Sequence, residues 1–220
     1  MERDRFLARL RDRLDAAPPA ASPAHPPIPC REVAVPLYRR SLADLAAAFI
    51  EEAGANGVEV RRVAGGGLGA LLAEVVATHG VRTAVLSRDP ETHGVAPLLA
   101  ALGVEELPWD GAEPVAAADL GVTGAAFGIA ATGSVVVDAG RAGGRSVSLL
   151  PPVHLALVGA GSLLSTPGDL LRGMGRIFPD GPPSQMVIIT GPSKTGDIEL
   201  VLVTGVHGPG HLWVGLLEEA

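Results

Sequence analysis

Short apolar runs alternate with segments of helical periodicity in the first half of the chain, and this alternation limits the fold more than any other feature. Strands are expected over 57–63 and 82–87. Three segments have helical spacing, each followed by a glycine that can end a helix: 42–53, 68–79 and 93–102. Strands separated by helices of about ten residues are typical of right-handed βαβ units and a parallel sheet. The first half therefore predicts an α/β protein.

The second half adds strands that need not share one direction. The run 145–150 and the strand before it flank a glycine-rich turn and predict an antiparallel hairpin. A helix is expected over 166–178, with Thr166 as its cap. The segment 198–203 fits either a strand or a helix capped by Asp197. Strands are expected over 120–123, 134–138, 154–158, 186–190 and 211–217. The strand over 186–190 is expected to be buried. The sum is a three-layer α/β sandwich with a mixed, mostly parallel sheet.

The N-terminal region differs from the rest. Apolar residues within positions 6–14 repeat at helical spacing between charged residues, which predicts a helix that either packs on its own domain or faces a partner. The uninterrupted apolar stretch of a secretory signal is missing there. Residues 17–36 are rich in proline and alanine and predict an extended linker. The expected domains are therefore 1–36, a charged helix with its linker, and 37–220, the α/β domain.

Charge and cysteine content narrow the classes of function. The formal net charge is −7, which argues against nucleic acid or an anionic membrane as the main partner. Cys30 is the single cysteine, so an intrachain disulfide, a four-cysteine zinc site and an iron–sulfur cluster are excluded, and a cytoplasmic location is expected. Residues 146–168 carry no charged side chain. Because Pro151 and Pro152 interrupt them, buried strands are expected there rather than a transmembrane segment.

Three places have compositions suited to chemistry, and open α/β sheets bind ligands at the carboxyl ends of their strands. The first is Thr190-Gly-Pro-Ser-Lys-Thr-Gly-Asp197, which directly follows an expected strand. Its glycines allow close backbone approach, its amides and hydroxyls suit an anion, and Lys194, the one lysine of the chain, adds a positive charge. A plain turn is the alternative. The loop is not a Walker A motif, because Asp197-Ile198 stands where Lys-Ser/Thr is required.

The second place is the segment 122–134. Thr123 and Gly124 end an expected strand, and Thr132 and Gly133 lead into the next one. Small and hydroxylated residues on both sides of a tight corner predict the floor of a pocket. The alternative is that the glycines and alanines serve only close packing. If this corner and the Lys194 loop meet, they form one cradle for an anion.

The third place combines His154 and His207, each beside a proline-constrained turn. Either histidine could act as a general acid or base, and a hydrogen-bonded structural role is the alternative. A metal pair of His207 and His211 is disfavoured, because the Gly208-Pro209-Gly210 run between them excludes a helix that would put both on one face.

A dinucleotide fingerprint is a further alternative. Gly65, Gly67 and Ala70 have the G-x-G-x-x-A spacing after an expected strand, and Asp89 lies at the end of the next strand. The pattern has low specificity in a chain with 29 glycines. It would make the protein a nicotinamide-dependent oxidoreductase.

Three long runs, GVTGAAFGIAATGSVVV, SLLPPVHLALV and TGPSKTGDIELVLVTGVHGPGHLWVGLL, occur in this order between Asp119 and Leu217. With them the chain resembles the lactate-utilisation protein C family (LutC/YkgG) of the LUD-domain group. The charged N-terminal helix and linker are also similar, whereas residues 55–115 match only in pattern. The resemblance implies a fold like that of the NagB, ribose-5-phosphate isomerase (RpiA) and CoA-transferase group.

The resemblance also implies a function. It suggests an accessory, non-redox component of a system that oxidises L-lactate to pyruvate, acting with two larger iron–sulfur proteins (LutA-like and LutB-like). The iron–sulfur clusters are then expected on those partners, and no cofactor is expected in this chain. The alternative by analogy of fold alone is a stand-alone NagB-like enzyme acting on a phosphosugar or a CoA thioester.

Carried over residue by residue, the resemblance implies catalytic roles for His154, His207 and Lys194, and no metal ligands. The ligand-binding residues that it implies are Thr123, Gly124, Thr132, Gly133, Gly191, Ser193, Thr195, Asp197 and Glu199. One position departs from the family, which usually has Glu-Thr-Gly where this chain has Ala131-Thr132-Gly133. A carboxylate nucleophile or base is therefore missing at this place, which favours a binding or assembly role.

Overall fold

The computed structural model describes residues 5, 7–9, 11–12, 45–109, 111–142, 144–179, 181–196 and 202–218. The chain divides into two units, residues 1–37 and 38–220. In the first unit the described residues are helical. The expected linker over 17–36, Cys30, and the candidate residues Asp197 and Glu199 lie outside the described residues.

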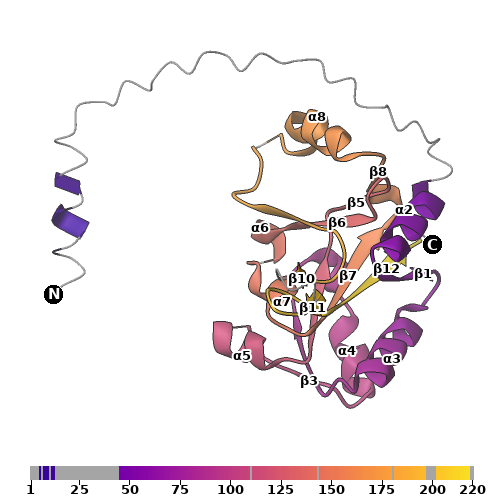
Figure 1. Cartoon of the computed structure of the whole chain (residues 1–220). Helices are drawn as coiled ribbons and strands as arrows, with labels where there is room; N and C mark the ends of the chain where they lie inside the picture. The colour runs from indigo at the N-terminus through magenta and orange to yellow at the C-terminus, as the bar shows by residue number, and fades with distance from the viewer. Residues whose placement is uncertain are drawn as a thin grey trace. The chain divides into compact units, whose positions relative to one another are not determined.

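A six-stranded parallel sheet forms the centre of the second unit (Figure 1). Its strand order is β1 (Glu59–Val63), β12 (His211–Leu217), β7 (Val153–Gly159), β4 (Leu120–Gly124), β2 (Thr83–Leu86) and β3 (Glu105–Glu106). Every neighbouring pair is parallel. The expected α/β class is confirmed. The antiparallel pairs of the second half, β5 with β6 and β6 with β9, occur in a separate sheet, so the central sheet is itself not mixed.

Helices cover both faces of this sheet, α3 (Leu68–His79) and α4 (Val95–Ala101) on one and α2 (Leu45–Ala55) on the other. The strand β7 is buried between them. Its Leu155 and Leu157 pack with the helix α3 cluster, whereas Ala156 and Val158 pack with the cluster around Phe49 of α2. Because both faces of β7 are covered, no charged side chain is tolerated along it, which accounts for much of the uncharged stretch.

Helix α3 ends where the sequence predicts. Gly80 follows it with a left-handed φ of 63°, and its N–H donates to the carbonyl of Val76. The remaining short helices fill connections: η2 (Pro90–Thr92), α5 (Ala112–Ala117), α6 (Ala139–Ala142), α7 (Ser146–Leu149) and η3 (Ala160–Ser162). Val115 of α5 and Val147 of α7 form a smaller apolar cluster with Val85 of β2.

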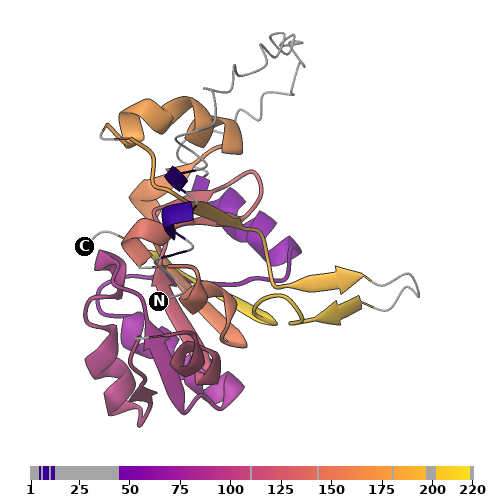
Figure 2. The same ribbon diagram turned by 90° about the vertical axis from the view of Figure 1, so that its left-hand side faces the viewer.

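A second sheet has the order β8 (Leu163–Leu164), β5 (Phe127–Ile129), β6 (Ser134–Asp138) and β9 (Met186–Ile189). Strand β6 pairs antiparallel with both β5 and β9. Helix α8 (Pro167–Ile177) covers one face of this sheet, and Thr166 caps it in a capping box with Asp169. An antiparallel ribbon of β10 (Lys194–Gly196) and β11 (Leu202–Thr204) extends away from the body of the unit (Figure 2).

Two expectations for the second half are wrong. The predicted hairpin of 134–138 with 145–150 does not form, because β6 is paired with β5 and β9 and the chain after it becomes helical. The Asp138 carboxylate accepts the N–H of Gly140 at 2.8 Å and so starts α6 in place of a hairpin turn. The strand β9, predicted as buried, lies at a sheet edge with Ile188 48% exposed.

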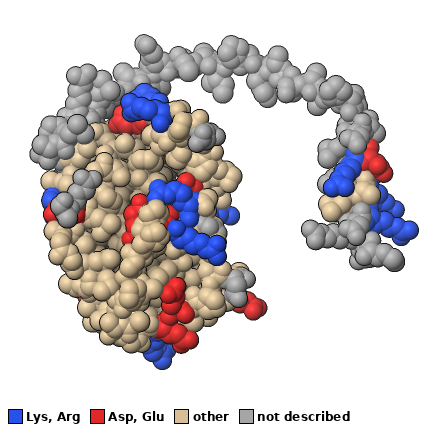
Figure 3. All heavy atoms as spheres, turned by 180° about the vertical axis from the view of Figure 1, so that it is seen from behind, with Lys and Arg blue, Asp and Glu red and all other residues tan. Residues whose placement is uncertain are grey.

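The surface of the second unit is mixed in charge on the face seen in Figure 3. Basic and acidic side chains lie close together there, and much of the surface carries neither. That face lacks, among the described residues, the broad basic surface that nucleic-acid binding requires. Within the described ranges, no helix has both the length and the hydropathy needed to cross a bilayer.

Candidate functional site

Three hydroxyl groups connect the two predicted corners. Thr132 Oγ1 lies 2.7 Å from Ser134 Oγ, which in turn lies 2.7 Å from Thr190 Oγ1. Strand β6 pairs antiparallel with β9, and Val135 lies opposite Ile189. Ser134, one residue before Val135, therefore lies opposite Thr190, one residue after Ile189. Ser134, in the middle, is buried, whereas Thr132 is half-buried and Thr190 is exposed, so the chain of hydroxyls has a buried centre and more accessible ends. The corner at Thr132–Gly133 and the loop after Thr190 therefore do meet.

Asn56, directly after α2, links the same two segments and was missed by the sequence analysis. Its Nδ2 donates to the carbonyl of Thr132 at 3.1 Å and to that of Glu52 at 2.9 Å. Its own carbonyl accepts the ammonium of Lys194 at 3.2 Å. The Asn-Gly pair at the end of a predicted helix was the available signal, since such pairs end helices and make turns.

The glycines of the two corners serve close packing against the end of α2. Gly133 has φ +59°, and a Cβ there would overlap the backbone of Ala53. Gly191 has φ +89°, and a Cβ there would come within 2.9 Å of the Asn56 carbonyl oxygen. Both positions therefore need glycine for the fold itself. The packing alternative accounts for these two residues without any ligand.

Lys194 supplies a positive charge at this place. Its side chain is exposed, and none of the carboxylates in the described part of the chain lies within ion-pair distance of it. The ammonium lies beside the Asn56–Gly57 turn, where a Cβ on Gly57 would be 3.6 Å from Nζ. Thr195 follows it in β10 and is half-buried.

Ser193 joins the loop to the C-terminal part of the chain. Its N–H donates to the carbonyl of Pro209 at 2.9 Å, and its carbonyl accepts the N–H of Gly205 at 3.0 Å. Its Oγ accepts the backbone N–H of His207 at 3.4 Å. The structure thus brings His207, which is exposed, next to Ser193. The amide of Ser193 is already used, so an anion here would rely on side chains more than on backbone N–H groups.

Thr123 and His154 form a buried pair at a different place. Thr123 Oγ1 lies 2.9 Å from His154 Nε2, and both side chains are fully buried on β4 and β7. His154 Nδ1 has no hydrogen-bond partner among the described residues. Burial lowers the pKa of His154 to about 4, so the imidazole is neutral at pH 7. A buried neutral histidine fits the structural alternative better than proton exchange with a ligand in solution.

Gly124 contacts a buried carboxylate that the sequence singled out only as part of the dinucleotide pattern. Asp89, 3% exposed, accepts the N–H of Gly124 at 3.1 Å and the hydroxyl of Ser87 at 2.5 Å. Burial raises the pKa of Asp89 against the lowering effect of these hydrogen bonds. Arg141 lies 4.0 Å from Asp89 and 3.2 Å from Glu91. A carboxylate three residues after the end of β2 was the available signal.

The predicted residues therefore fall at two opposite edges of the parallel sheet. Gly210 N–H donates to the carbonyl of Pro152, and these residues immediately precede β12 and β7, so the Ser193 loop lies at the amino ends of the strands. Gly124 and Asp89 lie at the carboxyl ends of β4 and β2. The expectation that the Lys194 loop is at the carboxyl edge is wrong, because β9 belongs to the second sheet.

The dinucleotide alternative loses its support. The glycines at 65–67 follow β1, and Asp89 follows β2, but β12, β7 and β4 lie between these two strands. The fingerprint requires the glycine loop and the acidic residue to share one crevice. For metals, the described ranges contain no group of three His, Cys, Asp or Glu residues that could hold an ion.

Comparison with known proteins identifies the family. The LUD domain matches residues 46–217. A lactate utilization protein C from Shouchella clausii is 30% identical over 175 residues, which are 76% of this chain and 76% of that protein. A lactate utilization protein C from Halalkalibacterium halodurans is 40% identical over 94 residues, 42% of this chain. This chain spans only 41% of the length of the Halalkalibacterium protein.

A solved structure agrees at the level of the fold. The crystal structure of a DUF162 family protein from Deinococcus radiodurans superposes with a TM-score of 0.57 and 21% identity, covering 82% of this chain and all of that one (100%). Together with the match over most of the α/β unit, these similarities lead to one conclusion. The chain belongs to the LUD-domain family, in its LutC/YkgG group.

Proposed function

We propose that this protein is the non-redox, accessory component of an L-lactate oxidation system and binds a small anionic ligand at Lys194. Two relatives named lactate utilization protein C support a role of this chain in lactate utilization. The single cysteine of the chain supports the non-redox role, because iron–sulfur clusters need several cysteines. The electron carriers are then partner proteins of the LutA-like and LutB-like kinds.

The observation that carries the ligand proposal is the meeting of two distant corners beside Lys194, a cation with no ion-pair partner among the described residues. The hydroxyl of Thr190 is bonded to that of Ser134, and the ammonium of Lys194 is held on the neighbouring Asn56 carbonyl. Ser193 and Thr195, which flank Lys194 in the sequence, carry further hydroxyls. A single exposed charge pair contributes at most about 1 kcal/mol, so measurable binding requires donors in addition to Lys194.

Growth on L-lactate tests the pathway. Deletion of the gene in its own organism is expected to abolish growth on L-lactate while growth on pyruvate continues, because only the oxidation step is lost. Complementation with the wild-type gene is expected to restore growth, and Lys194→Ala to restore it only in part. Arg172→Ala is the matched control, since Arg172 is an exposed cation on α8. Normal growth of the deletion strain, with no second lactate oxidase present, would overturn the proposal.

Isolation of the assembled system tests the accessory role. The tagged full chain is expected to retain two larger proteins that contain iron and acid-labile sulfide, while the purified chain alone contains neither. Recovery of lactate oxidation by the chain without these partners would contradict the accessory role.

A further inference from the structure

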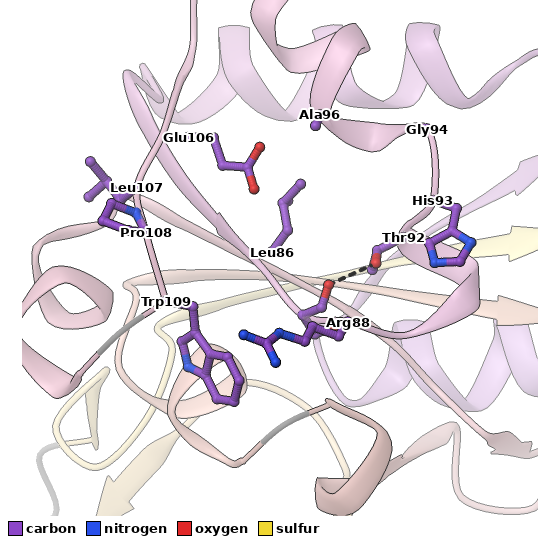
Figure 4. A pocket seen from close by; sticks show the side chains of 11 residues that line it. Leu86, Arg88, Thr92, His93, Gly94, Ala96, Glu106, Leu107, Pro108 and Trp109 are labelled. Carbon is purple, nitrogen blue, oxygen red and sulfur yellow. Dashed lines mark hydrogen bonds between the residues drawn. The ribbon is translucent and has the colours of Figure 1, made fainter.

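A cavity of about 410 Å³ opens at the carboxyl ends of β2 and β3, next to the start of α4 (Figure 4). This volume is within the range of roughly 300–1,000 Å³ that ligand pockets occupy. The carboxyl ends of parallel strands are also where open α/β sheets bind ligands. None of the candidate residues from the sequence lines this cavity. Its polar lining comes from five side chains: Ser87, Arg88, Thr92, His93 and Glu106.

Arg88 is the cation of the cavity, and an aromatic platform holds it. Its guanidinium carbon lies 5.1 Å from the ring centroid of Trp109, and Figure 4 shows the side chain reaching toward that ring. Trp109 is itself fixed, because its Nε1–H donates to Ser146 Oγ at 3.2 Å. In the described part of the chain, Arg88 has no carboxylate within ion-pair distance. A planar guanidinium in this state is ready to bind a carboxylate through two N–H groups.

Glu106 favours a hydrogen-bond donor on the ligand, whereas Arg88 favours an anionic group. Its carboxylate lines the same cavity from β3, and Figure 4 shows it on the side of Leu86 away from Trp109. An inorganic anion that fills the cavity would meet this negative charge. A ligand that carries both a carboxylate and a hydroxyl donor satisfies Arg88 and Glu106. Leu86, Leu107 and Pro108 provide apolar wall for its carbon atoms.

The floor of the cavity is held in place by buried hydrogen bonds. Thr92 Oγ1 donates to the carbonyl of Ser87 at 2.9 Å, and Ser87 Oγ donates to Asp89 at 2.5 Å. All three residues are at most 5% exposed. The loop after β2 that carries Arg88 is thereby fixed on both sides of this residue, which reduces the ordering cost of binding.

From these contacts we infer that this cavity binds a small hydroxycarboxylate, with its carboxylate on Arg88 and a hydroxyl on Glu106. The inference does not rest on the proposed function, because the cavity and Lys194 lie at opposite edges of the parallel sheet. L-lactate is one such ligand. A six-carbon sugar acid such as gluconate has the same chemistry and fills more of the volume.

Titration of the purified full chain with L-lactate, gluconate, pyruvate and inorganic phosphate tests the inference. The chain has two tryptophans, and Trp213 is 3% exposed with its Nε1–H donated to His79, so a ligand-dependent change in emission reports on Trp109. L-lactate or gluconate is expected to bind more tightly than pyruvate and phosphate, which have no carbon-borne hydroxyl for Glu106. Absence of binding by both hydroxycarboxylates overturns the inference, as does equal binding of all four probes.

Two variants with a matched control locate the ligand. Arg88→Gln is expected to weaken hydroxycarboxylate binding by about tenfold or more, since it removes a charge-assisted pair. Glu106→Gln is expected to narrow the preference for hydroxycarboxylate over pyruvate. Arg82 is exposed and directly precedes β2, at the other end of the strand from Arg88. Arg82→Gln is therefore expected to bind the hydroxycarboxylate like wild type. All three side chains are exposed, and matching circular dichroism checks that each variant folds.

The same titration separates this site from the Lys194 site. Lys194→Ala is expected to leave the Trp109 signal unchanged. If Lys194→Ala removes the signal and Arg88→Gln does not, the cavity inference fails while the proposed function stands. If the hydroxycarboxylate binds in the cavity but the deletion strain grows normally on L-lactate, the proposed function fails while the cavity inference stands.

Discussion

The hydroxyl of Thr123 lies 2.9 Å from Nε2 of His154, and both side chains are fully buried between the parallel sheet and the elements that cover it. This contact links Thr123, near the end of β4, to His154, near the start of β7. In the strand register, the residue opposite His154 is Gly121. Because Nδ1 has no partner among the described residues, protonation of this ring is strongly disfavoured. The pair therefore makes the stability of the fold depend on pH.

Stability is expected to fall as the pH drops from about 7 to about 4. Burial lowers the folded-state pKa of His154 from 6.5 to about 4, so the unfolded chain binds the proton more tightly. The stability that neutral His154 provides is complete above pH 6.5 and is lost as the pH falls toward 4. The full effect is about 3 kcal/mol. Urea unfolding of wild type and His154→Gln at several pH values measures it, and the variant is expected to have the shallower dependence.

His93→Gln is the control for this prediction, because His93 is an exposed histidine. Its pH dependence is expected to match wild type. Parallel curves for wild type and His154→Gln would contradict the assignment of this effect to His154.

Gly124→Ala is expected to destabilise the protein by about 1–3 kcal/mol. A Cβ at this position overlaps the side chains of Asp89 and Glu91, and the first of these is buried. Gly175→Ala is the matched change, since Gly175 lies in α8 with nothing within 4 Å of its Cβ position. That variant is expected to gain about 0.5–1 kcal/mol. Thermal unfolding of both variants measures the difference, and equal effects would contradict the packing at Gly124.

Asn56→Ala is expected to cost about 1–2 kcal/mol, because the carbonyls of Thr132 and Glu52 lose a shared donor. Asn56→Asp keeps the size of the side chain but removes both N–H donors. It is expected to be destabilised at least as much as Asn56→Ala. Urea unfolding distinguishes the cases, and a stable Asn56→Asp protein would show that the amide donors do not link α2 to the corner.

Local patterns predicted individual elements well where short-range physics decides them. The helix 68–79 with its terminal Gly80 and the strand 211–217 have the predicted bounds. The cap at Thr166 was also predicted, and the structure adds Asp169 to it as the second half of a capping box. Such signals depend on neighbours in the sequence, so a sequence carries them directly.

The features that were not predicted depend on pairing between strands that are far apart in the sequence. The strand 134–138 has partners on both sides, β5 and β9, and the second of these is some fifty residues away in the sequence. The assignment of β9 to a separate sheet moved the Lys194 loop from the expected carboxyl edge to the amino edge. Arg88 and Trp109 were missed for the same reason, because only the parallel pairing of β2 with β3 brings the ends of these strands together.

The most direct measurement of the central claim is the crystal structure of the full chain in the presence of L-lactate. The account predicts density for the carboxylate within hydrogen-bond distance of Lys194 Nζ, beside the hydroxyls that join Ser134 to Thr190. A lactate bound only elsewhere, or none bound while Lys194 remains open to solvent, would contradict the claim that this junction holds an anion.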